Sequence, residues 1–229
     1  MAKNKRKGRK RSSGSHKRQA GRHSTRKSIL IVCEGTETEP AYFNEFKAQL
    51  NLPLVEIVGK GTGEGHSGVV KHALQLKKER EKQYNSPKKR RKSLTKVPFD
   101  EVWCVFDCEA PLYRHKFYQA IKEAKKNGFQ LAVSNPAFEY WYLLHFKDTR
   151  RFFANAGQII QALRQHIPDY RKNKNVFHKL YPHTDKAIER AKRSFKKPSH
   201  DGDQYPNPST LVFKLVEKLQ NMSTESIFR

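Results

Sequence analysis

The sequence predicts an α/β protein with a mostly parallel sheet flanked by helices. Four short apolar runs rich in β-branched and aromatic residues alternate with segments whose apolar residues recur at helical spacing. The runs are SILIVCEG (28–35), LVEIV (54–58), EVWCVFD (101–107) and QLAVS (130–134). Strands that alternate with helices at this spacing are typical of a parallel sheet covered on both faces.

The first strand and helix carry the clearest pattern. SILIVCEG is a continuous apolar run, as expected of a strand buried on both faces. In the next segment the apolar positions follow a helical period: Tyr42, Phe43, Phe46 and Leu50. Thr38, with Pro40 two positions later, is a typical helix start. We therefore expect a helix over 38–50.

The following elements repeat this alternation. GKGTGEGHSG (59–68) predicts a loop, and residues 69–84 predict a helix that runs into a basic insert at 82–98. A helix around 117–126 is ended by Gly128. After the fourth strand, Asn135 is expected to cap a helix that has Pro136 in its first turn and continues through AFEYWYLLHF.

The C-terminal part loses the strand pattern and predicts a helical extension. Short helices are expected around 156–166, 183–195 and 209–220, the last capped by Ser209 or Thr210, with a polar loop at 196–208. The predicted organisation is a basic disordered arm (1–27), an α/β domain (28–150) and the helical extension (151–229).

The net charge of +25 is concentrated in two segments. Residues 1–27 hold twelve Lys and Arg, residues 82–98 hold seven, and neither contains an acid. Such segments attract polyanions, so nucleic acid is the expected partner, although a tail that only aids solubility remains an alternative. No run of about 18 apolar residues and no signal-peptide pattern predicts a membrane segment, and three cysteines without CxxC spacing predict neither disulfides nor a zinc site. We expect a soluble, cytoplasmic protein.

Carboxylates follow the predicted strands at their carboxyl ends. Glu34, Glu37 and Glu39 follow the first strand, and Asp107 and Glu109 close the third. Glu139 lies in the first turn of the helix after the fourth. Carboxyl ends of parallel strands meet at one edge of a sheet, where reactive groups collect. Crowded carboxylates repel one another unless a cation lies between them, and their hard oxygen ligands suit Mg²⁺ or Mn²⁺.

Each acid also has an ordinary interpretation. Glu37 is more typical of a solvated loop, Glu39 equally fits a helix start, and Glu139 is favoured there by the helix dipole. Glu34 and Asp107 are the most specific, because each directly follows or closes a buried strand and the two strands are expected to be neighbours. The joint arrangement, not any single residue, indicates a site.

Several segments together resemble the RloB-like family, a branch of the Toprim-fold proteins associated with bacterial defence. They are SILIVCEGTETEPAYF, VFDCEA, AVSNPAFEYWYLLHF and NPSTLVFKLVEKL, which span roughly 28–220 in the same order as in the family. Toprim domains use a glutamate after the first strand and a DxD motif after the third to bind divalent metal for phosphoryl transfer. The resemblance therefore implies a metal-dependent nuclease.

The resemblance also implies roles for individual residues. Glu34 corresponds to the Toprim glutamate and Asp107 to the first acid of DxD, while Glu109 stands where the motif has a second aspartate. The family's Thr-Glu pair falls on Thr38 and Glu39, and the later glutamate of the nuclease branch on Glu139. Glu34, Asp107 and Glu109 are then expected to hold one metal, with Glu39 and Glu139 completing a second site or orienting the first.

Further candidates come from chemistry alone. Lys172, which lies outside both basic segments, is a candidate cation for the developing charge on a phosphate, although a solvated position is the ordinary interpretation. His145 is interpreted as a packing residue and His66 as a helix-start residue. Aromatic residues of FEYWYLLHFKDTRRFF are mostly expected in the core, and any that are exposed beside Arg are suited to stacking on bases.

Three hypotheses of function follow. The first is a Mg²⁺- or Mn²⁺-dependent nuclease that is the effector of an anti-phage defence module. The second is a non-catalytic nucleic-acid-binding protein in which the acids are structural. The third, from the resemblance, is a subunit that an ATPase partner holds inactive. The sequence leaves the choice of DNA or RNA and a homo-oligomer open.

Overall fold

A computed structural model of the 229-residue chain describes residues 27–61, 65–86, 97–108, 114–195 and 204–227. The N-terminal arm up to residue 26, most of the basic insert and Glu109 lie outside the described residues. The expectations for these parts therefore stay predictions.

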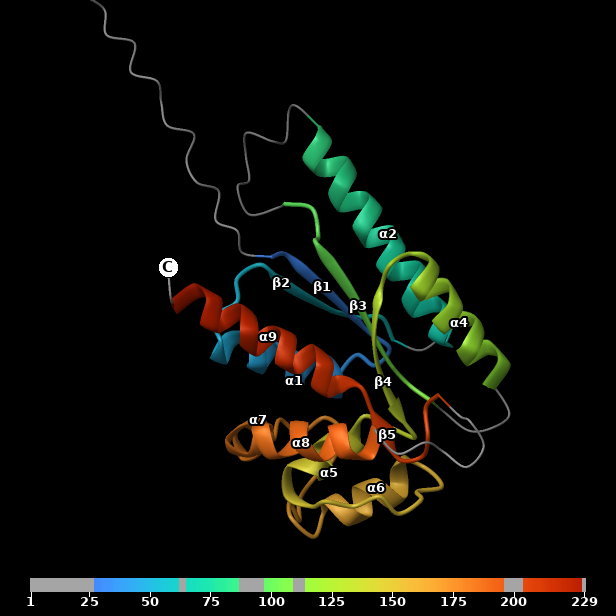
Figure 1. The fold of residues 1–229 in the computed structure, drawn as a ribbon, viewed down its shortest axis with the longest axis vertical. Coiled ribbons are helices and arrows are strands. Elements are labelled where there is room, and N and C mark those ends of the chain that lie inside the picture. Colours follow the sequence, from blue (N-terminus) through green and yellow to red (C-terminus); the bar gives the residue numbers. More distant parts are fainter. Residues whose placement is uncertain (1–26, 62–64, 87–96, 109–113, 196–203, 228–229) are drawn as a thin grey trace, which may run out of the picture.

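The core of the fold is one five-stranded sheet (Figure 1). Its strands are β1 (Ile29–Cys33), β2 (Val55–Gly59), β3 (Glu101–Asp107), β4 (Gln130–Asn135) and β5 (Ser209–Thr210), in the spatial order β2-β1-β3-β4-β5. The first four strands pair in parallel, whereas β5 is antiparallel to β4. This confirms the predicted mostly parallel sheet and the predicted pairing of the first strand with the third.

Helices cover both faces of the sheet and its carboxyl edge. The helical elements are α1 (Thr38–Gln49), α2 (Gly65–Asn85), α4 (Arg114–Lys126), α5 (Glu139–Phe146), α6 (Ala156–Leu163), α7 (Phe177–Leu180), η2 (Tyr181–His183), α8 (Thr184–Phe195) and α9 (Val212–Ile227). Figure 1 shows α2 and α4 on one face and α1 and α9 on the other, with α5 to α8 gathered beyond the strand ends. None of the helices in the described part of the chain is long and apolar enough to cross a membrane.

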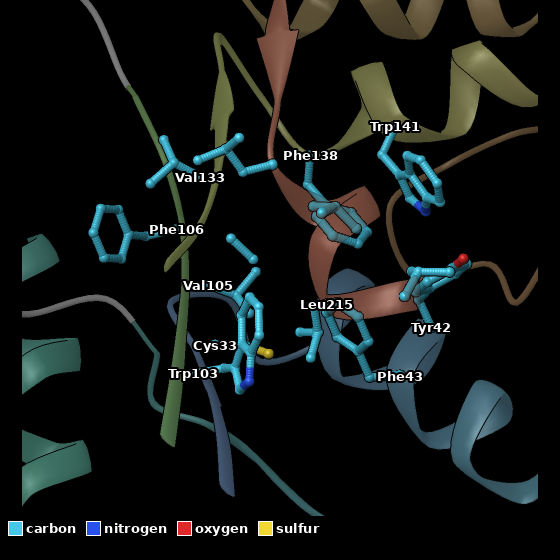
Figure 2. Close-up of a cluster of buried hydrophobic side chains, with 14 of the residues drawn as sticks. Cys33, Tyr42, Phe43, Trp103, Val105, Phe106, Val133, Phe138, Trp141 and Leu215 are labelled. Carbon is cyan, nitrogen blue, oxygen red and sulfur yellow. The ribbon is translucent and has the colours of Figure 1, made fainter. Parts of the chain in front are cut away.

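An aromatic core joins the sheet to α1, α5 and α9 (Figure 2). Val105 and Cys33 point from the sheet toward Phe43 of α1 and Leu215 of α9, whereas Phe106 points to the opposite face. There the Phe106 ring contacts Phe117 of α4, with 5.9 Å between ring centroids. The alternation of side chains along β3 thus fills both layers from a single strand.

Helix α5 is buried around most of its circumference, so it lacks the one-sided pattern of a surface helix. Tyr140 donates a hydrogen bond to the carbonyl of Thr149, while Trp141 contacts Tyr42 on another side of the helix. The sequence interpretation placed most of these aromatics in the core, and the structure confirms this for Phe138 and Tyr142. Tyr140 and Trp141 are also buried, and they face different neighbours.

Three local expectations were wrong. Asn135 is not a helix cap, because it ends β4 and its side-chain amide donates to the carbonyl of Tyr205 at 2.7 Å. Helix α5 begins only at Glu139. Ser209 and Thr210 form a short strand instead of starting the last helix, although the Thr210 hydroxyl still accepts a hydrogen bond from Val212 N–H. In each case pairing with a distant segment overrides the local signal.

The aromatic core predicts a large difference between two phenylalanines. Replacing Phe43, which is fully buried, with alanine should lower the free energy of unfolding by about 3–5 kcal/mol, because it leaves a cavity between sheet and helix. Phe152, which is 69% exposed, provides the control, and Phe152→Ala should change that free energy by less than about 0.5 kcal/mol. Urea unfolding followed by circular dichroism measures both, and similar losses in the two variants would contradict this core assignment.

Candidate functional site

The predicted acids gather where β1 and β3 end side by side. Glu34 directly follows β1, and its amide donates to the carbonyl of Val105 in β3 at 2.9 Å. Asp107 is the last residue of β3, and the next amide, that of Cys108, donates to Ser134 of β4 at 2.7 Å. The sheet therefore brings the ends of three parallel strands to one edge, as the sequence predicted.

Glu39 lies in the first turn of α1 and folds back over the end of β1. Its carboxylate accepts backbone hydrogen bonds from its own amide and from Gly35. A Cβ atom added at Gly35 would overlap this carboxylate, so a larger residue there would displace the Glu39 side chain from its position. Burial nevertheless raises the pKa of Glu39, and the charge of Glu139 raises it further, whereas Lys172 lowers it.

Asp107 is the most strongly perturbed acid of the site. Burial raises its pKa well above the ordinary value, and the charges of Glu39, Glu139 and Glu34 raise it further. A backbone hydrogen bond from Phe138, at the start of α5, acts in the opposite direction. Acids that follow β1 or begin α1 and α5 therefore all lie within electrostatic reach of Asp107 at the end of β3. Strongly shifted groups in such a cluster are typical of functional sites.

Glu139 and Lys172 form an ion pair across the site. The Glu139 side chain is 2% exposed and that of Lys172 is 58% exposed, and their Oε1 and Nζ atoms are 3.7 Å apart. The loop that carries Lys172 is held over α1, because the Thr38 hydroxyl donates to the Lys172 carbonyl at 2.8 Å. Tyr170, also in this loop, places its hydroxyl beside Glu139. Lys172 thus lies beside Glu139, and its role as a cation for phosphate stays a prediction.

His66 is a site residue that the sequence analysis did not assign. It lies near the start of α2, as predicted, but its buried ring reaches the acids of the sheet edge. Its Nε2 is 2.8 Å from the carbonyl oxygen of Asp107 and 4.0 Å from Oε2 of Glu34. Edge contacts with Phe106 and Phe117 fix the ring. The only signal in the sequence was a histidine in the glycine-rich loop after the second strand.

Other candidate residues lie elsewhere. His145 is buried in the aromatic core, where its Nδ1 lies 2.8 Å from the Trp141 carbonyl and burial lowers its pKa to about 3. Its interpretation as a packing residue is consistent with this position. Cys33, Cys104 and Cys108 are buried, and none of them forms a disulfide. Glu37 is exposed at the start of α1, as expected of a loop acid.

The chemistry of the acidic cluster suits a hard divalent cation, because its donors are carboxylate oxygens that repel one another when ionised. Within the ranges that the structure describes, however, no three His, Cys, Asp or Glu side chains are arranged closely enough to hold a metal ion. Glu109, a predicted ligand, lies outside those ranges. The described acids therefore offer the oxygen donors that such a metal prefers. To bind it, their side chains would have to move closer together or be joined by a further ligand.

Fold and site together define an α/β protein with a buried acidic cluster at the carboxyl edge of a parallel sheet. The chain belongs to the RloB-like protein family, whose model matches residues 29–219. This confirms the family suggested by the sequence motifs. The matched range includes Glu34, Glu39, Asp107, Glu139 and Lys172. Comparisons with curated proteins and with solved structures yield no match.

The raised pKa of Asp107 predicts how stability depends on pH. A folded-state pKa above the unfolded one means that the folded protein holds the proton more tightly, so stability falls as pH rises from the ordinary pKa through the folded one. Asp107→Asn removes this loss. In chelator at neutral pH the variant should be about 1–3 kcal/mol more stable than the wild type, and the difference should vanish near pH 4.

Urea unfolding across this pH range provides the measurement. Glu37→Gln, which changes an exposed acid in the same loop region, should leave the pH profile of the wild type intact. An Asp107→Asn protein that is less stable than the wild type at neutral pH would contradict the assignment of Asp107 as a partly buried carboxylate that its neighbours repel.

The position of His66 predicts a separate effect. His66→Phe keeps a ring against Phe106 and Phe117 but removes the hydrogen bond to the Asp107 carbonyl. The free energy of unfolding should fall by about 1–3 kcal/mol, because a buried carbonyl loses its partner. His72→Phe on the same helix is the matched control. Equal stabilities of the two variants in urea would show that the His66 contact is not formed.

Proposed function

We propose that this protein is a Mg²⁺- or Mn²⁺-dependent phosphodiesterase of the Toprim type that cleaves nucleic acid. The observation that carries the proposal is the cluster of Glu34, Glu39, Asp107 and Glu139, in which the other three acids all raise the pKa of Asp107. Carboxylates that lie close together away from water repel one another and destabilise a fold. Such a cluster is therefore typical of a functional site, where a bound cation can offset the repulsion.

On this proposal the acidic side chains bind the metal and the lysine binds phosphate. Glu34 and Asp107 would hold the metal from the two central strands, with Glu109 as the third ligand and Glu39 and Glu139 beside them. A bound divalent metal would supply a polarised phosphate and an activated water. Lys172 is anchored by Glu139 and remains more than half exposed, so its ammonium group can meet the negative charge of a phosphate at the edge of the site.

The basic segments fit this substrate class. Residues 1–27 and 82–98 hold most of the positive charge, and they attract phosphate chains without sequence preference. The family's association with defence adds that the nuclease acts as an effector against phage, with an ATPase partner that restrains it. On this view, expression of the chain without the ATPase is toxic to the cell.

A non-catalytic nucleic-acid-binding protein is the second candidate. It is favoured by the finding that the described residues contain no ready group of three metal ligands. In that case the acids are structural, and the basic segments alone supply affinity. Cleavage and binding therefore have to be measured separately.

The test compares the wild type with Glu34→Gln and Asp107→Asn on single- and double-stranded DNA and RNA, with Mg²⁺, Mn²⁺ or chelator. We expect cleavage that requires metal and falls at least about 100-fold in either variant, because each loses a negative ligand. Glu37→Gln, an exposed acid of the same region, should retain activity. Mg²⁺ should also raise the melting temperature of the wild type more than that of Asp107→Asn.

Two outcomes would contradict the proposal. Cleavage that persists equally in both variants would place the active site elsewhere. Absence of cleavage together with absence of a metal-dependent melting shift, in protein that binds nucleic acid, would support the second candidate. A metal-dependent shift without cleavage, combined with toxicity on expression, would instead indicate control by a partner.

A further inference from the structure

The segment between α5 and α6 presents two neighbouring phenylalanines in opposite ways. Phe152 is 69% exposed, whereas Phe153 is fully buried. In the described part of the chain, the only other large hydrophobic side chain that is exposed is Tyr118, at 37%. An exposed aromatic ring on its own needs no explanation, but the surroundings of Phe152 set it apart.

The contacts of Phe153 hold the backbone next to Phe152 in place. Its amide donates to the Asn207 side-chain oxygen at 3.2 Å, and its carbonyl accepts from the Asn207 side-chain amide at 2.8 Å. Its ring packs against Tyr140 of α5, with 6.3 Å between centroids. Both backbone groups and the ring of Phe153 are therefore held, so Phe152 projects from an anchored segment.

Two arginines precede the exposed ring. Arg150 and Arg151 are both exposed, and within the described ranges neither forms an ion pair with an acid. The Arg151 guanidinium lies 4.7 Å from the centroid of the Phe153 ring, a cation–π contact that ties Arg151 to the anchored residue next to Phe152 in the chain. Positive charge and an exposed aromatic face thus occur together on a fixed stretch of chain.

This segment is tied to the edge of the sheet that carries the acids. Asn207 lies two residues before β5, and Ser209 of β5 pairs with Asn135 at the carboxyl end of β4. Tyr140, against which Phe153 packs, directly follows Glu139 in α5. The same elements that place Glu139 at the site therefore also position the exposed ring.

We propose that Phe152, Arg150 and Arg151 form a platform for single-stranded nucleic acid, on which an unpaired base stacks against Phe152 while the arginines bind the flanking phosphates. A base inside a duplex is already stacked on its neighbours, so its face is closed to the ring. The inference rests on the nucleic-acid substrate of the proposed function and adds a preference for unpaired strands.

The test measures binding without cleavage. The full-length chain, in chelator, is titrated against labelled single strands of DNA and of RNA about 12 nucleotides long and against the matching duplexes, with fluorescence anisotropy as the readout. Phe152→Ala should weaken binding to single strands at least about fivefold and leave duplex binding within about twofold. Phe152→Trp should retain single-strand binding, and Tyr118→Ala is the matched control for an exposed aromatic ring.

The arginines should act through charge. Replacing Arg150 and Arg151 together with glutamine should reduce the dependence of the binding constant on salt concentration for single strands. Whether DNA or RNA strands lose more affinity in Phe152→Ala identifies the preferred strand. Single-strand binding unchanged in Phe152→Ala, or an equal loss on duplexes, would overturn the platform.

The two proposals fail in different experiments. Because binding is measured in chelator, a Phe152-dependent preference for single strands supports the platform even if the protein cleaves nothing. Metal-dependent cleavage with no effect of Phe152→Ala on binding would leave the nuclease in place and reject the platform. Urea unfolding of Phe152→Ala should give the same free energy of unfolding as the wild type, so that a weaker affinity cannot be due to unfolded protein.

Discussion

Asp107 lies partly buried at the end of a central strand, where the charges of three neighbouring acids disfavour the charge of its own carboxyl group. A parallel sheet places the ends of β1, β3 and β4 at one edge, so Glu34 and the helix that carries Glu139 must lie near it. The N-terminal ends of α1 and α5 supply backbone amides whose hydrogen bonds oppose the rise in the pKa of Glu39 and Asp107. These amides carry the partial positive charge of a helix start, which reduces the repulsion among the acids without removing it.

The strands and most helices could be predicted because their signals are local. SILIVCEG and EVWCVFD each contain a continuous apolar run, as strands between two helical layers must, and the aromatic residues of α1 recur at helical spacing and are buried. The start of α5 and the short strand β5 could not be predicted. Helix α5 is enclosed on several sides, so its sequence lacks a polar face, and β5 exists only because two residues pair with the end of β4.

The acidic part of the site was predictable for the same reason. Carboxylates at the ends of neighbouring parallel strands have to meet, whatever the details of the loops. Lys172 could be named but not placed, since its position depends on a hydrogen bond from Thr38 that spans 134 residues of chain. His66 was taken for a helix start, which it is, because nothing in its local sequence indicates that its ring turns toward Asp107.

The positive and negative charges of the molecule lie in different places. If the proposed function holds, this separation couples the binding of metal to the binding of substrate. Basic segments attract a phosphate chain, yet among the described residues the site itself holds four acids and a single lysine, which is paired with one of them. A phosphate that reaches this edge is repelled until positive charge is added. A divalent cation adds it, and by thermodynamic linkage the phosphate must then tighten the binding of the cation by the same factor. On the proposed function, the acids therefore repel the phosphates of nucleic acid when no metal is bound, even though the basic segments attract them.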